Sequence, residues 1–308
     1  MRSRPVSGRP STSRTPIRRP SASRPSEGRR QALTAPALSP AIRAFDAIAP
    51  DFDARFSACK SVAAQRRAVR RALLAAYPAG ARLLELGGGT GEDALFLAAA
   101  GRHVHVTDGA ARMVERTRSK ARAAGIDGRV TAERVALEEL PSWASARAGA
   151  PLFDGAFSNF ASLNCVTDHA DVARGLARVL PAGAHALLVV FGPASPGEVA
   201  VLLARGRFRA AFRRFSRVPA FARLAGESFS VTYPSPRALA AAFAPWFVLE
   251  GTMGVGLFVP PSSAEPFVSR VPLAVAAGEA LDRIFARPLA FLADHVLLDF
   301  TRTDAEVA

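Results

Sequence analysis

Residues 83–93 read Leu83-Leu84-Glu85-Leu86-Gly87-Gly88-Gly89-Thr90-Gly91-Glu92-Asp93, an apolar run that enters a glycine-rich turn and then a helix start. Glycines at 87, 89 and 91 let the backbone pass close to a ligand, because a Cβ at those points would clash or forbid the turn. A second apolar run follows about twenty residues later and leads to Asp108, where an acid can bind both hydroxyls of a ribose. Together, the turn and the acid predict a site for a nucleoside cofactor.

Apolar runs and helical patterns alternate around this turn. We expect strands at 82–86, 103–107, 130–135, 153–158 and 185–191, and helices at 92–100, 110–124 and 170–179. Strands that alternate with helices favour an α/β fold, in which a doubly wound, mostly parallel sheet carries helices on both faces. Ligands bind such sheets at the carboxyl ends of the strands, where the glycine turn and Asp108 are expected to lie.

The chain divides into three parts. Residues 1–40 are rich in Ser, Arg and Pro and are expected to form a disordered tail. Residues 41–192 form the core behind an N-terminal lid, in which a short helix breaks at Pro50 and a second helix continues toward Tyr77. Residues 193–308 supply a substrate cap and the final strands. There we expect a helical insertion at 197–225, strands at 229–233, 247–259 and 295–300, and helices at 236–244 and 264–287.

The net charge of +14 is unevenly distributed. Residues 1–30 hold nine Arg and one acid, which accounts for +8 and leaves +6 for the rest. Only two lysines occur in the chain, and the preference for Arg, together with abundant Ala, indicates a GC-rich genome. Nucleic acid is therefore not expected as a partner. The tail could also be an anionic-surface binder, a transit peptide or a twin-arginine signal, but we favour an extension without function.

The cysteines and the apolar runs argue against a metal-binding protein and against a membrane-spanning protein. Cys59 and Cys165 match no metal-ligand spacing, so no metal site is expected, and a reduced, cytoplasmic location is the default. The longest apolar runs are too short to span a bilayer, which needs about 20 residues. No internal repeat is evident.

The glycine turn fits a cofactor without phosphates. The dinucleotide fingerprint requires glycines at i, i+2 and i+5, but the residue five after Gly87 is Glu92. No Gly-Lys-Ser/Thr sequence is present for a phosphate-binding loop. Glu92 and Asp93 also place negative charge where a helix start would receive a phosphate. S-adenosylmethionine, which carries a ribose, an adenine and a cationic sulfonium, suits this site better.

Over residues 45–192, the chain resembles class I S-adenosylmethionine-dependent methyltransferases. The segment 83–91 is similar to the first motif of that family, Phe153-Asp154-Gly155-Ala156-Phe157-Ser158-Asn159-Phe160 to the fourth, and Phe45 to Phe56 to the lid of quinone-biosynthesis and malonyl-carrier methyltransferases. The resemblance implies a Rossmann-like methyltransferase fold with seven strands and a helical cap. It also implies cofactor contacts from Phe52, Glu85, Gly87, Gly88, Gly89, Gly91, Asp108, Gly109, Met113, Ala136, Leu137, Ser158 and Asn159.

One position departs from the family pattern. Members often carry an acid after the third strand that accepts from the adenine amino group, but Ala136 stands at that position here. We therefore expect adenine to be recognised by the backbone around Ala136 and Leu137.

Methyl transfer is an in-line displacement, and a general base is needed only when the nucleophile starts protonated. His169, Tyr233 and His295 are the candidates for that base. We retain His169 and Tyr233, although a helix cap and core packing are the structural alternatives for them, and we expect His295 to be structural. Cys165 is expected to be a small buried hydrophobe. The arginines at 205–217 are expected to form a solvated helix face, with a clamp on an anionic acceptor as the alternative.

These patterns predict a methyltransferase that acts on a small-molecule acceptor. The alternatives are a protein that binds S-adenosylmethionine without catalysis, a methyltransferase acting on protein or nucleic acid, and nucleic-acid binding through the tail. The Asp/Asn-Pro-Pro-aromatic signature of amino-methylating nucleic-acid enzymes is absent, since residues 158–161 read Ser-Asn-Phe-Ala. The acceptor, the atom methylated and the oligomeric state stay open.

Overall fold

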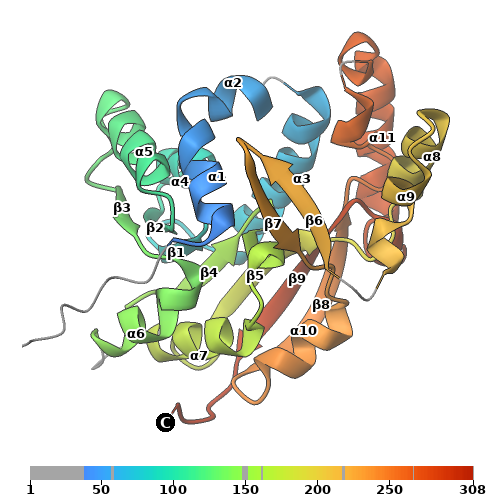
Figure 1. Cartoon of the computed structure of the whole chain (residues 1–308). Helices are drawn as coiled ribbons and strands as arrows, with labels where there is room; N and C mark the ends of the chain where they lie inside the picture. Colours follow the sequence, from blue (N-terminus) through green and yellow to red (C-terminus); the bar gives the residue numbers. More distant parts are fainter. Residues whose placement is uncertain are drawn as a thin grey trace, which may run out of the picture. The chain divides into compact units, whose positions relative to one another are not determined.

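The computed structural model describes residues 38–56, 59–147, 152–160, 162–216, 219–265 and 267–307. The tail predicted at 1–40 lies outside these ranges up to residue 37. Figure 1 shows the arrangement of helices and strands along the chain.

Seven strands form one sheet in the order β3-β2-β1-β4-β5-β9-β8. The first five of these are parallel neighbours, whereas β9 runs antiparallel to both β5 and β8. This topology confirms the predicted α/β fold with a mostly parallel sheet. The strands are β1 (Arg82–Leu86), β2 (His103–Asp108), β3 (Val130–Arg134), β4 (Gly155–Ser158), β5 (His185–Phe191), β8 (Phe247–Val255) and β9 (His295–Arg302).

Helices cover both faces of the sheet because successive strand residues point to opposite sides. Leu83 and Leu187 pack with residues of α3 (Lys60–Ala76), α4 (Glu92–Ala99) and α5 (Ala111–Ala123). Leu84 and Leu188 pack on the other face with α6 (Leu140–Ser145), α7 (His169–Val179) and α10 (Pro236–Phe243). Strands that are apolar on both sides thus specify the doubly wound arrangement.

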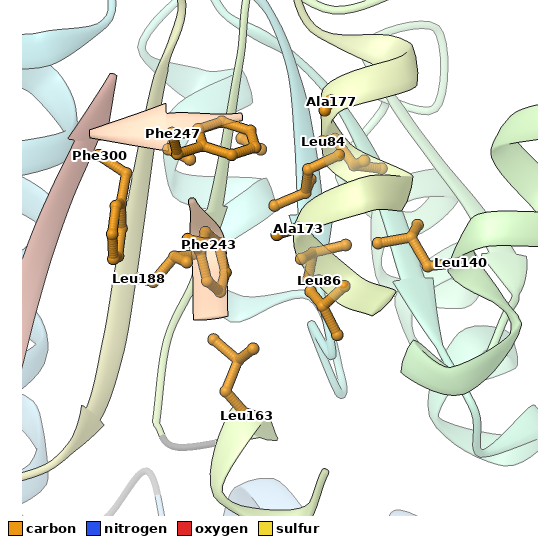
Figure 2. Close-up of a cluster of buried hydrophobic side chains, with 14 of the residues drawn as sticks. Leu84, Leu86, Leu140, Leu163, Ala173, Ala177, Leu188, Phe243, Phe247 and Phe300 are labelled. Atoms are coloured by element: carbon orange, nitrogen blue, oxygen red, sulfur yellow. The ribbon is translucent and has the colours of Figure 1, made fainter. Parts of the chain in front are cut away.

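Three phenylalanines close the second of these faces beneath α10. Figure 2 shows Phe243, Phe247 and Phe300 beside Leu188 in this cluster. The rings of Phe243 and Phe300 stack with their centroids 4.6 Å apart. Each large apolar side chain that is fully buried contributes about 1.5–3 kcal/mol to stability, so this cluster fixes α10 against β8 and β9.

The N-terminal segment differs from the predicted pair of helices. It forms α1 (Pro40–Ile48), a 3-10 turn at Ala49–Asp51 and the short α2 (Phe52–Phe56), and α3 begins at Lys60. The second helix therefore does not run on to Tyr77 as expected. Ser39 caps α1 by accepting from the Ile42 amide, a contact that fixes where the first helix starts.

The insertion after β5 is helical only in its first part. α8 (Pro196–Ala204) and α9 (Phe208–Ala211) are followed by a two-stranded hairpin of β6 (Ala220–Leu224) and β7 (Glu227–Val231). Ala225 and Gly226 at the turn both have positive φ, which a two-residue hairpin turn requires. The helix predicted over 197–225 is therefore wrong in its second half, where the Ala-Gly pair starts a hairpin.

The last helical region is also more broken than predicted. The helix expected over 264–287 is instead α11 (Pro272–Phe285), preceded by 3-10 turns at Ser262–Ala264 and Val268–Arg270. Pro272 occupies the first helical turn. Backbone N–H groups make no intrahelical hydrogen bond there, so proline, which has no N–H, is tolerated.

Candidate functional site

A cavity of about 390 Å³ lies at the carboxyl ends of the parallel strands. The glycine turn after β1, Asp108 after β2, the segment after β3 and Asn159 after β4 all contribute to its wall. All but two of the predicted cofactor residues line it, the exceptions being Gly91 and Ser158. The predicted residues that the structure brings together are Phe52, Glu85, Gly87, Gly88, Gly89, Asp108, Gly109, Met113, Ala136, Leu137 and Asn159.

The glycine turn is packed too closely to carry side chains. Gly87 has a φ of 60°, and a Cβ there would lie 2.5 Å from the Cβ of Ser162. A Cβ on Gly88 would lie 2.5 Å from Cγ1 of Val106 and 2.9 Å from Oε2 of Glu85. Such distances are well inside van der Waals contact, so only glycine fits at either position.

Glu85 is buried at the base of this turn without a hydrogen-bond partner for Oε2 among the described residues. Loss of hydration raises the pKa of this carboxyl well above its usual range, and the charge of Asp93 raises it further. A buried carboxylate oxygen with no partner is unfavourable unless a cation or a donor reaches it. This oxygen therefore offers a place for a cationic group.

Asp108, at the end of β2, lies against the glycine turn and is oriented by the backbone. Its two carboxylate oxygens accept from the amides of Gly89, at 2.9 Å, and Ala110, at 2.8 Å. Burial raises its pKa, whereas these two hydrogen bonds lower it. Each oxygen has a second lone pair, so the oriented carboxylate can also accept from two neighbouring hydroxyl groups.

Asp93, at the start of α4, is neutralised by two arginines of α3. Arg66 donates to it at 3.0 Å and Arg70 at 2.7 Å, and the Asn159 amide donates at 2.8 Å. The Arg66 guanidinium also lies 4.7 Å from the ring centroid of Phe160. Arg66 thus brings a cation to the cavity wall. The sequence contained no signal for this role of Arg66, because Arg66 and Asp93 are 27 positions apart and come together only in the folded chain.

The N-terminal helices cover the cavity and are tied to the glycine turn. Asp53 of α2 accepts from the Thr90 hydroxyl at 2.6 Å and from Lys120 at 3.0 Å. Lys120 also contacts Glu92. α2 is therefore held at the turn by ion pairs, in the place where the lid was predicted.

The wall between α1 and β3 is apolar and tightly packed. Met113 is fully buried beside Phe52, and a Cβ on Gly109 would lie 2.7 Å from Cδ1 of Ile42. The Ala136 amide, expected to face an adenine, instead donates to the Glu139 carboxylate at 2.9 Å. Glu139 thus uses one of the backbone groups on which the adenine prediction relied.

His295 lines the other end of the cavity, where the sequence suggested a structural role. Its ring stacks on Phe191 with centroids 4.9 Å apart, and Nδ1 lies 3.4 Å from Oδ2 of Asp294. Asp294 also accepts from Arg214 at 2.6 Å and from Gln65 at 3.1 Å. Burial raises the pKa of the Asp294 carboxyl, but the neighbouring His295 ring and the Arg214 guanidinium outweigh it and hold that pKa far below its usual range.

Two arginines of the insertion turn inward instead of lying on a solvated face. Arg214 is buried and donates to Glu198 at 2.8 Å and to the Asp294 carbonyl at 2.7 Å. Arg213 donates to Glu198 at 2.6 Å and to the Tyr233 hydroxyl at 3.0 Å. Arg205, Arg207 and Arg209 are exposed, as expected, whereas Arg217 falls outside the described residues.

Neither residue retained as a catalytic base lines the cavity. His169 lies against the Leu163 carbonyl at 3.0 Å, and burial lowers its pKa. It is Asp168, not His169, that caps α7. The Tyr233 hydroxyl accepts from Arg213. The structure thus places His295 at the cavity and leaves the other two candidates outside it.

The remaining candidates support the cavity or lie beside it. Gly91 starts α4 with a φ of 75°, and the Ser158 hydroxyl donates to the Leu86 carbonyl at 3.0 Å. Cys165 lines the cavity, but burial raises the pKa of its thiol to about 11 and disfavours a thiolate.

Within the described ranges, His, Cys, Asp and Glu side chains form no cluster that could hold a metal ion. No helix in those ranges is long and apolar enough to cross a membrane.

Comparison with known proteins gives a family match for one segment of the chain and a similar fold. Residues 83–183 match the family described as a methyltransferase domain. No curated protein matches the sequence. Among solved structures, the chain is similar to a putative S-adenosylmethionine dependent methyltransferase from Listeria monocytogenes, with 16% identity, a TM-score of 0.51 and coverage of 76% of this chain and 96% of that one. It is also similar to geranyl diphosphate C-methyltransferase from Streptomyces coelicolor A3(2), with 16% identity, a TM-score of 0.50 and 77% of each chain covered.

Proposed function

We propose that the chain is a class I S-adenosylmethionine-dependent methyltransferase that methylates a small molecule held between the glycine turn and His295. One observation carries the proposal. The unpartnered carboxylate oxygen of Glu85 and the oriented carboxylate of Asp108 both line the cavity beside a turn in which Gly87 and Gly88 leave no room for side chains.

The cavity suits the parts of S-adenosylmethionine one by one. Glu85 would accept from the amino group, and Asp108 from the two ribose hydroxyls. The apolar wall at Met113 and Leu137 would cover the adenine. Arg66, which also lines the cavity, would attract the carboxylate of the amino-acid end. When bound, the cofactor supplies a methyl group on a sulfonium, which is already activated for displacement.

The acceptor end favours a small molecule with an apolar body. Phe160, Phe191, Val166 and Leu224 line it. A volume of about 390 Å³ lies near the lower end of the range for small-molecule sites, which is about 300–1,000 Å³. The shared space leaves little room beside a cofactor, so a large acceptor would require the lid to move.

Within this cavity, the protein aligns the acceptor, excludes water and accepts a proton. Alignment alone can lower the barrier by about 7–11 kcal/mol. His295 is the base candidate in the wall, and the Asp294 carboxylate, 3.4 Å from its Nδ1, would balance the positive charge that the ring gains. We therefore propose that the acceptor carries a protic nucleophile, such as a hydroxyl. Its proton would pass to His295 as the oxygen bonds to the methyl carbon and the carbon–sulfur bond breaks to leave a neutral thioether.

Titration calorimetry with S-adenosylmethionine tests the cofactor assignment. We expect Asp108→Ala to weaken binding at least about 100-fold, because two hydrogen bonds to a charged group are lost, each worth about 1.5–3 kcal/mol. Asp127→Ala, which removes an exposed acid after α5, is the matched control and should bind normally. Failure of the unaltered protein to bind would overturn the proposal.

A second measurement separates enzyme from binder. The protein is incubated with methyl-labelled S-adenosylmethionine and a cell extract, and the label is followed into small molecules, protein and nucleic acid. We expect label in the small-molecule fraction. Label only in macromolecules would exclude a small acceptor, and tight cofactor binding without any transfer would leave the non-catalytic alternative.

A further inference from the structure

Helix α11 is apolar on both its inner and its outer side. Val275, Gly278 and Asp282 are buried on the inner side. A Cβ on Gly278 would lie 2.8 Å from the Phe258 carbonyl oxygen, so the helix packs closely on the chain beside it. On the outer side, Leu273 is 85% exposed and Ile284 is 68% exposed. A surface helix ordinarily carries its apolar residues on the one side that faces the core, whereas α11 has further large apolar residues on its outer side.

A second set of exposed aromatic side chains follows α8. Phe208, Phe212 and Phe215 are 64%, 52% and 60% exposed, and their spacing of four and three residues places them on one side of a helical turn. The rings of Phe212 and Phe215 lie 6.2 Å apart. Isolated exposed apolar residues are ordinary, but a group of this size marks an interaction site.

Both sets are attached to the same segment, residues 256–271. Arg205, at the end of α8, donates to the Ser263 carbonyl, and Phe285 of α11 packs edge-on against Phe258 with centroids 5.8 Å apart. Figure 1 shows α8, α9 and α11 grouped beyond the edge of the sheet that carries β8. We call the exposed set the apolar surface; it comprises Phe208, Phe212, Phe215, Phe267, Leu273 and Ile284.

Most of the charges around the apolar surface are positive, although Glu265, which accepts from Ser61 and Ser269, lies close to Phe267 in the chain. The arginines at 207, 209, 270, 283 and 287 are exposed, and their side chains have no ionic partner among the described residues. Residues 205–215 contain no acid, and residues 267–291 contain only two. Both of these are engaged, since Glu279 pairs with Arg67 and Asp282 accepts from the Leu257 and Phe258 amides. The surface therefore presents apolar groups and free positive charge.

We propose that the apolar surface binds the face of an anionic lipid bilayer. The phenylalanine, leucine and isoleucine side chains would enter the boundary between headgroups and acyl chains, and the arginines would meet the lipid phosphates. A second copy of the chain fits less well, because a symmetric contact would bring the five arginines of each copy together with too few acids to neutralise them. The proposal does not depend on the methyltransferase assignment.

Flotation of the full-length protein with vesicles tests the proposal. We expect binding to vesicles made of equal parts phosphatidylcholine and phosphatidylglycerol, and binding at least about tenfold weaker to phosphatidylcholine alone. The double variants Phe208→Ser with Phe212→Ser, and Leu273→Ser with Ile284→Ser, should each weaken binding at least about tenfold. Val248→Ser, at an exposed site on β8, is the matched control and should bind as the unaltered protein does.

Two further arms separate binding by the apolar surface from binding by the N-terminal arginines and from self-association. Arg207→Gln with Arg209→Gln should weaken binding to the anionic vesicles while thermal unfolding stays unchanged. Vesicle binding that survives both serine double variants would assign it to the arginines of residues 1–30 and overturn the proposal. Absence of vesicle binding, together with a dimer in sedimentation that the serine variants dissociate, would overturn it in favour of contact between two copies.

Discussion

At the cofactor end of the cavity, short segments hold the functional groups. Gly87 to Gly89 and Asp108 lie at the ends of neighbouring strands, and Asp108 is oriented by amides next to it in space. At the acceptor end, His295 depends on Asp294, which Arg214 reaches across 80 positions of the chain. The first end is therefore defined by backbone geometry that a motif encodes, and the second by ion pairs that only the folded chain assembles.

This difference predicts that the fold tolerates substitutions differently at the two ends. The turn keeps its shape mainly through its glycines and backbone hydrogen bonds. A set of buried charges works only when every partner is present, because a charge left alone in the interior is strongly unfavourable. The acceptor end should accordingly be more sensitive to single substitutions than the cofactor end.

The largest effect is expected for the base at the acceptor end. His295→Gln should lower the rate of label transfer by about 10²–10⁴-fold, the usual contribution of a general base. Cofactor affinity, measured by calorimetry, should stay within about threefold. His103→Gln, at an exposed position that starts β2, is the control. A rate unchanged in His295→Gln would remove the proton-acceptor role and leave this end of the cavity with a packing function.

Removing the central arginine of the acceptor end should mainly affect stability. Arg214→Met leaves Glu198 and Asp294 buried without their main partner, so we expect a loss of about 3–5 kcal/mol in the free energy of unfolding in urea. Arg223→Met, at an exposed site of β6, should change it by less than about 0.5 kcal/mol. If Arg214→Met lowered the free energy of unfolding by less than about 1 kcal/mol, the two ends of the cavity would tolerate single substitutions equally well.

Glu85 should make cofactor binding depend on pH. Its pKa is raised in the free protein, so the carboxyl retains a proton above its ordinary titration range, and a bound cation expels that proton. Affinity should therefore rise with pH, by up to about tenfold per unit, until the folded-state pKa is passed. Calorimetry in buffers of different protonation enthalpy should detect proton release.

Glu85→Gln is the matched variant for this effect. It should weaken binding about 10–100-fold at neutral pH and abolish both the pH dependence and the proton release. The same substitution removes a destabilising charge, whose unfavourable effect grows as the pH rises from about 4.5 toward the folded-state pKa. The variant should thus be more stable than the unaltered protein at neutral pH. Proton release that persists in it would assign the titration to another group.

The smallest effect concerns the tightness of the glycine turn. Gly87→Ala and Gly125→Ala both place alanine at a positive φ, 60° and 65°, but only the first creates a clash, with Ser162. We expect Gly87→Ala to be about 1–2 kcal/mol more destabilising than Gly125→Ala. Adding Ser162→Gly should recover most of this difference. Equal losses of stability in the two variants would show that the positive φ alone, without the contact to Ser162, accounts for the need for glycine at position 87.

The sequence predicted what depends on periodicity and local turns. Leu83 and Leu84, apolar on successive positions, indicated a strand covered on both faces, and the glycine spacing placed the cavity at its end. Within the insertion at 197–225, the expectation that the arginines form a solvated helix face failed for a physical reason. Arg213 and Arg214 resemble such a face in the sequence, and only folding brings Glu198 and Asp294 to them. His295 was assigned to packing for the same reason, because its neighbour in the cavity wall, Phe191, is remote along the chain.

Arg214 also limits how freely parts of this molecule could be exchanged. It joins the insertion to the Gly192 carbonyl, directly after β5, and to Asp294, directly before β9. An insertion transplanted into another protein of this fold would lose its anchor unless residue 294 travelled with it. Changing the acceptor by exchanging segments between proteins would therefore require the insertion and the chain around residue 294 to be exchanged together. A single continuous stretch of sequence would not be enough.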